Sequence, residues 1–248
     1  MSRVTYHTFY TDNIPNYIVD MHKEICKKFD VKVEYHVEKL TEVTDNDPFP
    51  GYRMHGECMD HVMKTSTNDV VGFLDIDCLP LSREDTIEME NYATMAKSFI
   101  GNAQNISHLS NRNLIYAAAS YLVIHKSIWK DLGEPSLRYN FIGEGNNSMQ
   151  IDTAMDLTIR ANYMGYDYQL LLPTGYSKPT EKPLKLGPYG WYGIGTFYPN
   201  TWHLLRVSEA HQNEEIRDLW LNVCSDILDD AMPSPLYKFY PYRLLNFF

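Results

Sequence analysis

The residues best suited to chemistry are two aspartates, Asp75 and Asp77, at the end of the apolar run Val70–Ile76. Such a run is typical of a central parallel strand that is buried on both faces, and open α/β sheets bind their ligands at the carboxyl ends of such strands. Two carboxylates spaced i, i+2 repel each other there, and a hard divalent cation such as Mg²⁺ or Mn²⁺ neutralises them and bridges to phosphates. The pair therefore predicts metal–phosphate chemistry; the alternative is a strand end with two solvated acids.

Alternating strands and helices place these acids in the chain. We expect an α/β fold, an α/β/α sandwich with a mostly parallel central sheet. The expected strands are Val4–Tyr10, Val31–Val37, Val70–Ile76 and Tyr168–Leu172, with a strand pair or extended segment at Asn113–Ile124. The expected helices are Ile14–Phe29, Met54–Met63, Arg83–Phe99 and Thr153–Met164, and the expected loops are Asp45–Gly51 and Pro173–Pro199.

Composition narrows the class of protein. The 248 residues suffice for one sizeable α/β domain, and we expect a single domain over 1–248. A net charge of -10 makes nucleic acid an unlikely partner, because duplex binding depends on clustered Lys and Arg. Four scattered cysteines without a CxxC pair argue against a zinc or disulfide framework and favour reduced thiols. With no secretory signal and no apolar run long enough to cross a bilayer, a cytoplasmic protein without a transmembrane segment is expected.

Three segments, in order, carry a resemblance to a known family. The sequence GFLDIDCLPL around Asp75 and Asp77 resembles the Asp-x-Asp motif of GT-A glycosyltransferases. Ala117–Gly133 resembles their acceptor-side segment, and Asp152–Tyr166 resembles their acidic helix. The resemblance, to family-2-like members with a Rossmann-like GT-A fold, implies a nucleotide-sugar donor, UDP-linked by analogy, and a glycan or other hydroxyl acceptor. It also implies Mn²⁺ or Mg²⁺ held by the two aspartates.

The same resemblance implies a general base in the acidic helix. Asp152 and Asp156 lie four residues apart on one helical face. The sequence departs from the family pattern because Gln150-Ile151-Asp152 replaces its Glu-Asp portion. We expect Asp152, at the helix entrance, to be the base. The alternatives are that Asp152 is only a helix N-cap, and that Asp156 forms an ion pair with Arg160.

The remaining site residues also follow from the resemblance. His203 is expected as a further metal ligand, although it could equally be an ordinary histidine. The donor nucleotide is expected to contact Thr8, Tyr10 and Asp12 after the first strand, and Ile76 between the two acids, with Tyr10 alternatively only packing. The Gly-rich loop Lys178–Tyr198, with Lys178 and Trp191, is expected to act as a lid or to be a plain surface loop. Residues 1–110 would bind the donor, and residues 111–248 would bind the acceptor and include the lid and the aromatic tail Leu236–Phe248.

Other functions fit these residues less well. Haloacid-dehalogenase-like phosphatases also follow an apolar strand with Asp-x-Asp, but their motif lies close to the N-terminus. Nucleotidyltransferases share the sheet and the acids, but the Gly-rich phosphate loop expected after the first strand is missing. A non-catalytic nucleotide- or sugar-binding module is a third alternative, and the intact acids argue against it.

Overall fold

The computed structural model describes residues 4–38, 50–106, 114–142, 149–179, 193–204 and 212–231, together with Val207, Ala210, Pro233 and 237–238. The helices are α1 (Asn16–Lys28), α2 (Pro50–Thr65), α3 (Arg83–Ala96), α4 (Lys126–Asp131), α5 (Met155–Met164) and α6 (Glu214–Leu228). The strands are β1 (Thr5–Thr11), β2 (Lys32–Glu38), β3 (Val70–Leu74), β4 (Cys78–Pro80), β5 (Phe99–Asn105), β6 (Ile115–His125), β7 (Asn140–Ile142), β8 (Met149–Ile151), β9 (Gln169–Leu171), β10 (Gly175–Pro179), β11 (Gly193–Phe197), β12 (Thr201–His203) and β13 (Tyr237–Lys238).

The central sheet has six strands in the order β2-β1-β3-β6-β5-β9. Strands β2, β1 and β3 run parallel to one another, and β5 runs parallel to β9. Strand β6 is antiparallel to both of its neighbours, β3 and β5, so it alone is reversed in this sheet. The mostly parallel sheet is confirmed. Residues 113–124, expected as a strand pair or extended segment, contribute the single strand β6.

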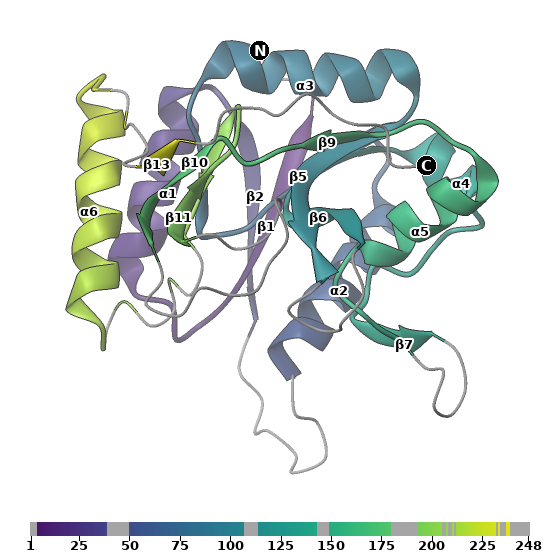
Figure 1. The fold of residues 1–248 in the computed structure, drawn as a ribbon, viewed down its shortest axis with the longest axis horizontal. Helices are drawn as coiled ribbons and strands as arrows, with labels where there is room; N and C mark the ends of the chain where they lie inside the picture. The colour runs from purple at the N-terminus through teal and green to yellow at the C-terminus, as the bar shows by residue number, and fades with distance from the viewer. Residues whose placement is uncertain are drawn as a thin grey trace.

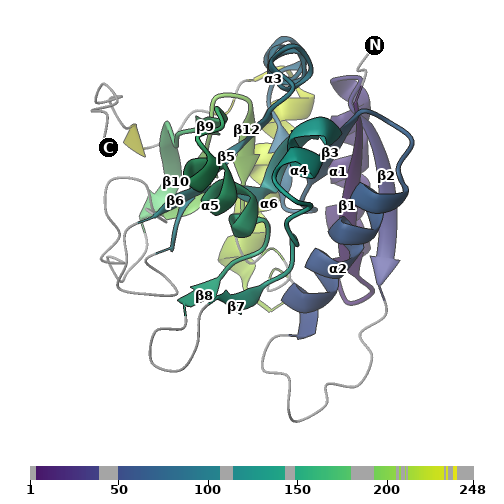
Figure 2. The ribbon, with the colours of Figure 1, turned by 90° about the vertical axis from the view of Figure 1, so that its right-hand side faces the viewer.

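Helices cover both faces of the central sheet, which confirms the α/β/α sandwich. On one face, Cys26 of α1 and Ala93 of α3 pack with Tyr6, Leu74 and other sheet residues. The opposite core contains side chains of α2, α4 and α5 packed on β3, β5 and β6. Figure 2 shows α2, α4 and α5 on the viewer's side of the sheet, with α6 behind it. In the part of the chain that the structure describes, no helix is both long and apolar enough to cross a bilayer.

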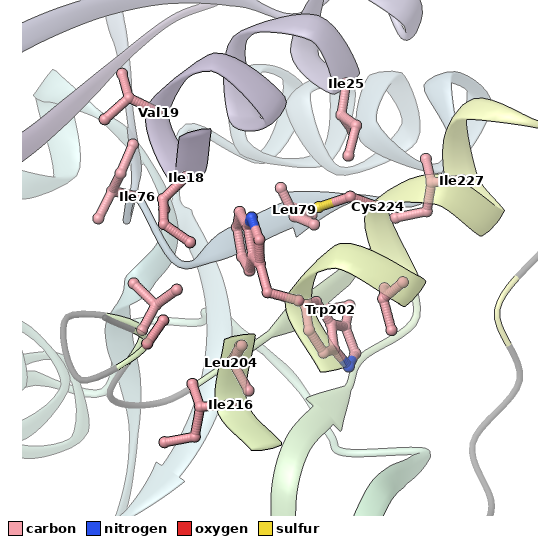
Figure 3. Packing of buried hydrophobic residues seen from close by; sticks show 14 of the residues in the cluster. Ile18, Val19, Ile25, Ile76, Leu79, Trp202, Leu204, Ile216, Cys224 and Ile227 are labelled. Atoms are coloured by element: carbon pink, nitrogen blue, oxygen red, sulfur yellow. The ribbon is translucent and has the colours of Figure 1, made fainter. Parts of the chain in front are cut away.

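A second sheet, in the order β13-β10-β11-β12-β4, packs against α1 and α6. Figure 1 shows these two helices side by side at one end of the molecule. Trp202 of β12, labelled in Figure 3, is fully buried here. Trp220 of α6 is also fully buried, and the two ring centroids lie 5.9 Å apart. The expectation of a loop over Pro173–Pro199 was wrong at its ends, which form β10 and β11. The expected helix ending at Phe99 stops at Ala96, because Phe99 begins the buried strand β5.

A glycine in the buried strand β3 has a packing reason. A Cβ atom added to Gly72 would lie 2.5 Å from Cδ1 of Tyr6 on the neighbouring strand β1. The Tyr6 ring is fully buried, and its hydroxyl lies 3.1 Å from the hydroxyl of Tyr121 on β6. Glycine therefore leaves the space that the Tyr6 ring occupies within the sheet.

A buried polar network centred on Asn102 joins the two sheets. Asn102, on β5, is fully buried, and its Nδ2 atom donates to Ser120 Oγ at 3.3 Å and to Thr201 Oγ1 at 3.2 Å. Ser120 belongs to β6 of the central sheet, and Thr201 begins β12 of the second sheet. Buried amides must be hydrogen-bonded to offset their loss of hydration. The network therefore holds β12 in place relative to the central sheet.

We predict that Asn102→Ala lowers the free energy of unfolding by about 1–3 kcal/mol, because Ser120 and Thr201 lose a buried partner. Denaturant unfolding followed by circular dichroism measures the change. Asn68→Ala, at an exposed position, is the matched control and should change stability by no more than about 0.5 kcal/mol. Equal stability of Asn102→Ala and the unaltered chain would contradict the proposed joining role.

Candidate active site

Asp75 and Asp77 lie in a tight turn between β3 and β4. The amide of Cys78 donates to the carbonyl of Asp75 at 2.9 Å, and the amide of Asp75 donates to the carbonyl of Ser120 on β6 at 3.0 Å. Between the two acids, Ile76 is only 6% exposed and packs in the core with Leu79 and Trp202 (Figure 3). Its burial anchors the middle of the turn, while the flanking carboxylates stay partly exposed.

His203 reaches the acids because β12 pairs with β4. The register aligns Trp202 with Leu79 and His203 with Cys78, and the amide of Leu204 donates to the carbonyl of Asp77 at 2.8 Å. Both neighbours of His203, Trp202 and Leu204, are fully buried in the core. Alternation along the strand therefore turns the imidazole of His203 out of that core. Its Nε2 atom lies 3.3 Å from Oδ1 of Asp77.

The three side chains form a compact donor set. One ligand atom from each of Asp75, Asp77 and His203 lies within 4.8 Å of the other two. Burial raises the pKa of Asp75, and the charges of Asp77 and Asp152 raise it further. Burial lowers the pKa of His203, but the charge and hydrogen bond of Asp77 and the charge of Asp75 outweigh burial and raise it overall. Two negatively charged carboxylates and an imidazole that lie this close together form a ligand set that fits a divalent cation.

His55, on α2, was missed in the sequence analysis. Its Nε2 atom lies 3.3 Å from Oδ1 of Asp75, and its positive charge, when protonated, lowers the pKa of Asp75. The Phe9 ring packs against the His55 ring, with centroids 5.8 Å apart. No local pattern marks His55, because its contact with Asp75 arises only when α2 packs on β1 and β3.

Asp152 and Asp156 have different surroundings. The carboxylate of Asp152 accepts hydrogen bonds from the Tyr116 hydroxyl and, at 2.8 Å, from the amide of Thr153. Asp152 also lies near enough to Asp75 for its charge to raise the pKa of Asp75. Asp156 instead forms an ion pair with Arg160 Nε at 2.9 Å, and Arg160 Nη1 donates to the carbonyl of Leu132. The structure thus joins Asp152, but not Asp156, to the acidic cluster through its electrostatics.

The residues expected at the nucleotide lie at or near the end of β1. The hydroxyl of the fully buried Thr8 donates to the carbonyl of Leu74 at 2.6 Å, so it ties β1 to the end of β3. Tyr10 is partly buried against the core between α1 and α6, and Asp12 is exposed. The backbone of Lys178 belongs to β10, but its side chain lies outside the described residues, as do Trp191 and most of the expected lid.

This chain resembles known proteins in structure but not in sequence, and the structural resemblance is limited. No family model matches the sequence, and no curated protein matches it significantly. A Drosophila β1,4-galactosyltransferase complex with manganese, UDP-Gal and xylobiose is 12% identical, with 86% of this chain and 74% of that chain covered and a TM-score of 0.43. A mannosyltransferase from Pyrobaculum calidifontis in complex with GDP-Man and Mn²⁺ is 13% identical, with 68% of this chain and 54% of that chain covered and a TM-score of 0.41.

A cytidylyltransferase from Thermus thermophilus is a third similar structure, 7% identical, with 67% of this chain and 87% of that chain covered and a TM-score of 0.36. This chain thus spans little more than half of the mannosyltransferase but most of the cytidylyltransferase. The likeness is limited, and it assigns no reaction to this chain.

A buried histidine supports the strand that follows the acidic turn. His22 of α1 is fully buried; its Nε2 atom lies 3.2 Å from the carbonyl oxygen of Cys78, and its Nδ1 atom lies 2.9 Å from the Tyr35 hydroxyl. Burial lowers the pKa of His22 to about 4, although the Cys78 carbonyl and the charge of Asp77 oppose the shift. A neutral His22 that donates to Cys78 and accepts from Tyr35 satisfies both contacts.

We predict that stability falls as the pH drops from about 6.5 to about 4, in part because of His22. In that interval the unfolded chain binds a proton at His22 and the folded chain does not, so protonation favours unfolding by up to about 1.4 kcal/mol per pH unit. Denaturant midpoints of the unaltered chain and of His22→Gln, measured between pH 4 and pH 7.5, test this. The variant should be less stable at neutral pH and show a shallower decline; parallel profiles would contradict the prediction.

Proposed function

We propose that this chain is a metal-dependent glycosyltransferase that moves a sugar from a nucleoside-diphosphate sugar, UDP-linked, to an acceptor hydroxyl. The observation that carries the proposal is the cluster of Asp75, Asp77 and His203 beyond the end of β3, at the carboxyl edge of a mostly parallel sheet. Ligands of open α/β sheets bind at this edge. The ordered resemblance of three sequence segments to GT-A enzymes supports the same reaction.

Asp75, Asp77 and His203 would hold Mn²⁺ or Mg²⁺. When bound, the ion offsets the charge of the donor diphosphate and of the leaving nucleoside diphosphate. His55 contacts Asp75 on the side of α2 and so orients that carboxylate, as partners of metal ligands commonly do. The anchored Ile76 and the β4–β12 pairing keep the three ligand side chains together before the donor arrives.

Asp152 is the proposed general base. As the acceptor oxygen forms its bond to the anomeric carbon, the bond from that carbon to the diphosphate breaks, and the hydroxyl proton passes to the carboxylate of Asp152. The hydrogen bonds from Tyr116 and from the Thr153 amide fix the orientation of this carboxylate. Asp156, engaged by Arg160, is assigned a structural role at the start of α5.

The rest of the proposed donor site surrounds the end of β1. Tyr10 and Asp12 would face the nucleoside. The hydrogen bond from the Thr8 hydroxyl to the Leu74 carbonyl would hold this end of β1 in place. Lys178 and Trp191 are proposed as lid contacts to the donor. Residues 1–110 would then supply most donor contacts, and residues 111–248 would supply the acceptor side with Asp152.

We predict that Mn²⁺ strengthens the binding of UDP and that Asp77→Asn weakens this Mn²⁺-dependent binding by at least about 10–100-fold, because removing a ligand costs no less than removing its supporting partner. Isothermal titration calorimetry with and without Mn²⁺ measures the effect. Asp226→Asn, at an exposed position on α6, is the matched control and should bind like the unaltered chain. Binding of UDP that is independent of the metal would contradict the proposed site.

We predict that Asp152→Asn lowers kcat by about 10²–10⁴-fold, because an amide cannot accept the acceptor proton. The affinity for UDP with Mn²⁺ should stay within about threefold, since Asp152 is not proposed to hold the metal. The test uses the donor sugar that a thermal-shift screen selects. Asp156→Asn should lower Tm with little loss of kcat. Unchanged turnover in Asp152→Asn would move the base elsewhere.

A further inference from the structure

A second cluster of metal-ligating side chains lies on the neighbouring strands β1 and β2. His7 of β1 aligns with Glu34 of β2, and Phe9 aligns with His36. Residues aligned across parallel strands, and residues two apart along a strand, lie on one face of the sheet. His7, Glu34 and His36 therefore share the face that α2 covers in part, and none of them belongs to the acidic cluster.

Two separations in this cluster lie on either side of the value expected around a tetrahedral zinc ion. Nδ1 of His7 lies 3.0 Å from Nε2 of His36 and 3.6 Å from Oε2 of Glu34. A tetrahedral zinc ion bound at roughly 2.0–2.2 Å separates its ligand atoms by about 3.4 Å, which lies between the two measured values. All three ligand atoms lie within 4.8 Å of one another.

A hydrogen bond between the two imidazoles is the simpler explanation, but it accounts for only part of the arrangement. It uses Nδ1 of His7 and Nε2 of His36 and leaves the carboxylate of Glu34 at 3.6 Å, which is too long for a good hydrogen bond. Glu34 is about half exposed, and its Oε2 atom lies 3.6 Å from Nδ1 of the buried His7. Strand alignment brings the three groups together, and a shared ion would engage all three at once.

Packing has already ordered the two rings. His7 is 8% exposed, and its ring stacks on that of His36 with centroids 5.3 Å apart. The Phe9 ring also stacks on the His36 ring, with the two centroids 4.8 Å apart. Ordered ligands lose little conformational entropy when an ion binds. A pocket lined by Phe9, His36 and residues of α2, including His61, lies beside the cluster.

We propose that His7, Glu34 and His36 form a second divalent-metal site that prefers Zn²⁺ over Mg²⁺. Two imidazoles and one carboxylate suit zinc and its neighbours in the transition series, whereas the acidic cluster suits Mg²⁺ and Mn²⁺. Three protein ligands leave a fourth position, which water can fill from the exposed side of Glu34. An ion here links β2, the edge strand of the central sheet, to β1.

The test is a zinc titration of the full chain, with a chromophoric chelator as competitor. In a chain carrying Asp75→Asn and Asp77→Asn, one equivalent of Zn²⁺ should still bind, and adding His36→Gln should weaken that binding at least tenfold. Mg²⁺ in tenfold excess over Zn²⁺ should not displace the ion. A chain with only one zinc site, lost when the two aspartates are replaced, would overturn the proposal.

Two single variants serve as controls in the otherwise unaltered chain. Glu34→Gln changes a half-exposed side chain, and it should weaken one class of zinc site at least tenfold while Mn²⁺-dependent UDP binding stays unchanged. Zinc binding in this variant therefore tests the second metal site, and UDP binding tests the proposed glycosyltransferase site independently. His61→Gln, on the exposed part of α2, should keep full zinc binding. Undiminished binding in Glu34→Gln, or a loss in His61→Gln as large as that in His36→Gln, would overturn the proposed ligand set.

Discussion

The candidate active site depends on the pairing of β4 with β12. One backbone hydrogen bond, from the amide of Leu204 to the carbonyl of Asp77, sits at the end of this short ladder. Because the ladder sets which side chain of β12 lies beside the acidic turn, a shift of one residue would turn His203 into the core and expose Trp202. The burial of Trp202 against Trp220 and Phe197 opposes that shift. Hydrophobic packing thus holds the geometry of a polar site.

The site concentrates negative charge on two carboxylates that are largely buried. Burial and the charges of Asp77 and Asp152 raise the pKa of Asp75, and the charges of His55 and His203 lower it without cancelling that rise. A divalent cation bound as proposed would neutralise more of this negative charge. Asp152 and Asp156 also differ in their partners. Arg160 pairs with Asp156 within its own helix, whereas Asp152 accepts hydrogen bonds from the Tyr116 hydroxyl and the Thr153 amide and acts on Asp75 through its charge.

The two proposed metal sites differ in the chemistry of their ligands. The turn after β3 offers two carboxylates and one imidazole, and it lies where parallel strands end and donor phosphates can approach. The β1–β2 cluster offers two imidazoles and one carboxylate beside the edge of the sheet, where the rings of His7, His36 and Phe9 stack. Ligand type and position therefore support the proposal of hard ions at the first site and zinc-like ions at the second.

The sequence by itself determined the main layers of the fold and the acidic pair. The run Val70–Leu74 is apolar throughout because both faces of β3 are covered, and a pattern of this kind is visible without coordinates. The pattern cannot show direction, so the reversal of β6 became visible only in the sheet. Strands β4 and β12, with three residues each, carry too little pattern to be recognised. Strands β10 and β11 were expected to be loop because Gly and Pro crowd the span Pro173–Pro199.

Tertiary structure alone decided which side chains meet. His203 is one of nine histidines, and only the β4–β12 register sets it beside Asp77. His55 and Tyr116 reach Asp75 and Asp152 from distant parts of the chain, and His7 meets Glu34 and His36 through strand alignment. Local sequence encodes burial and backbone preference, because these act over a few residues. Contacts between distant residues depend on how the elements pack, and that packing created both clusters.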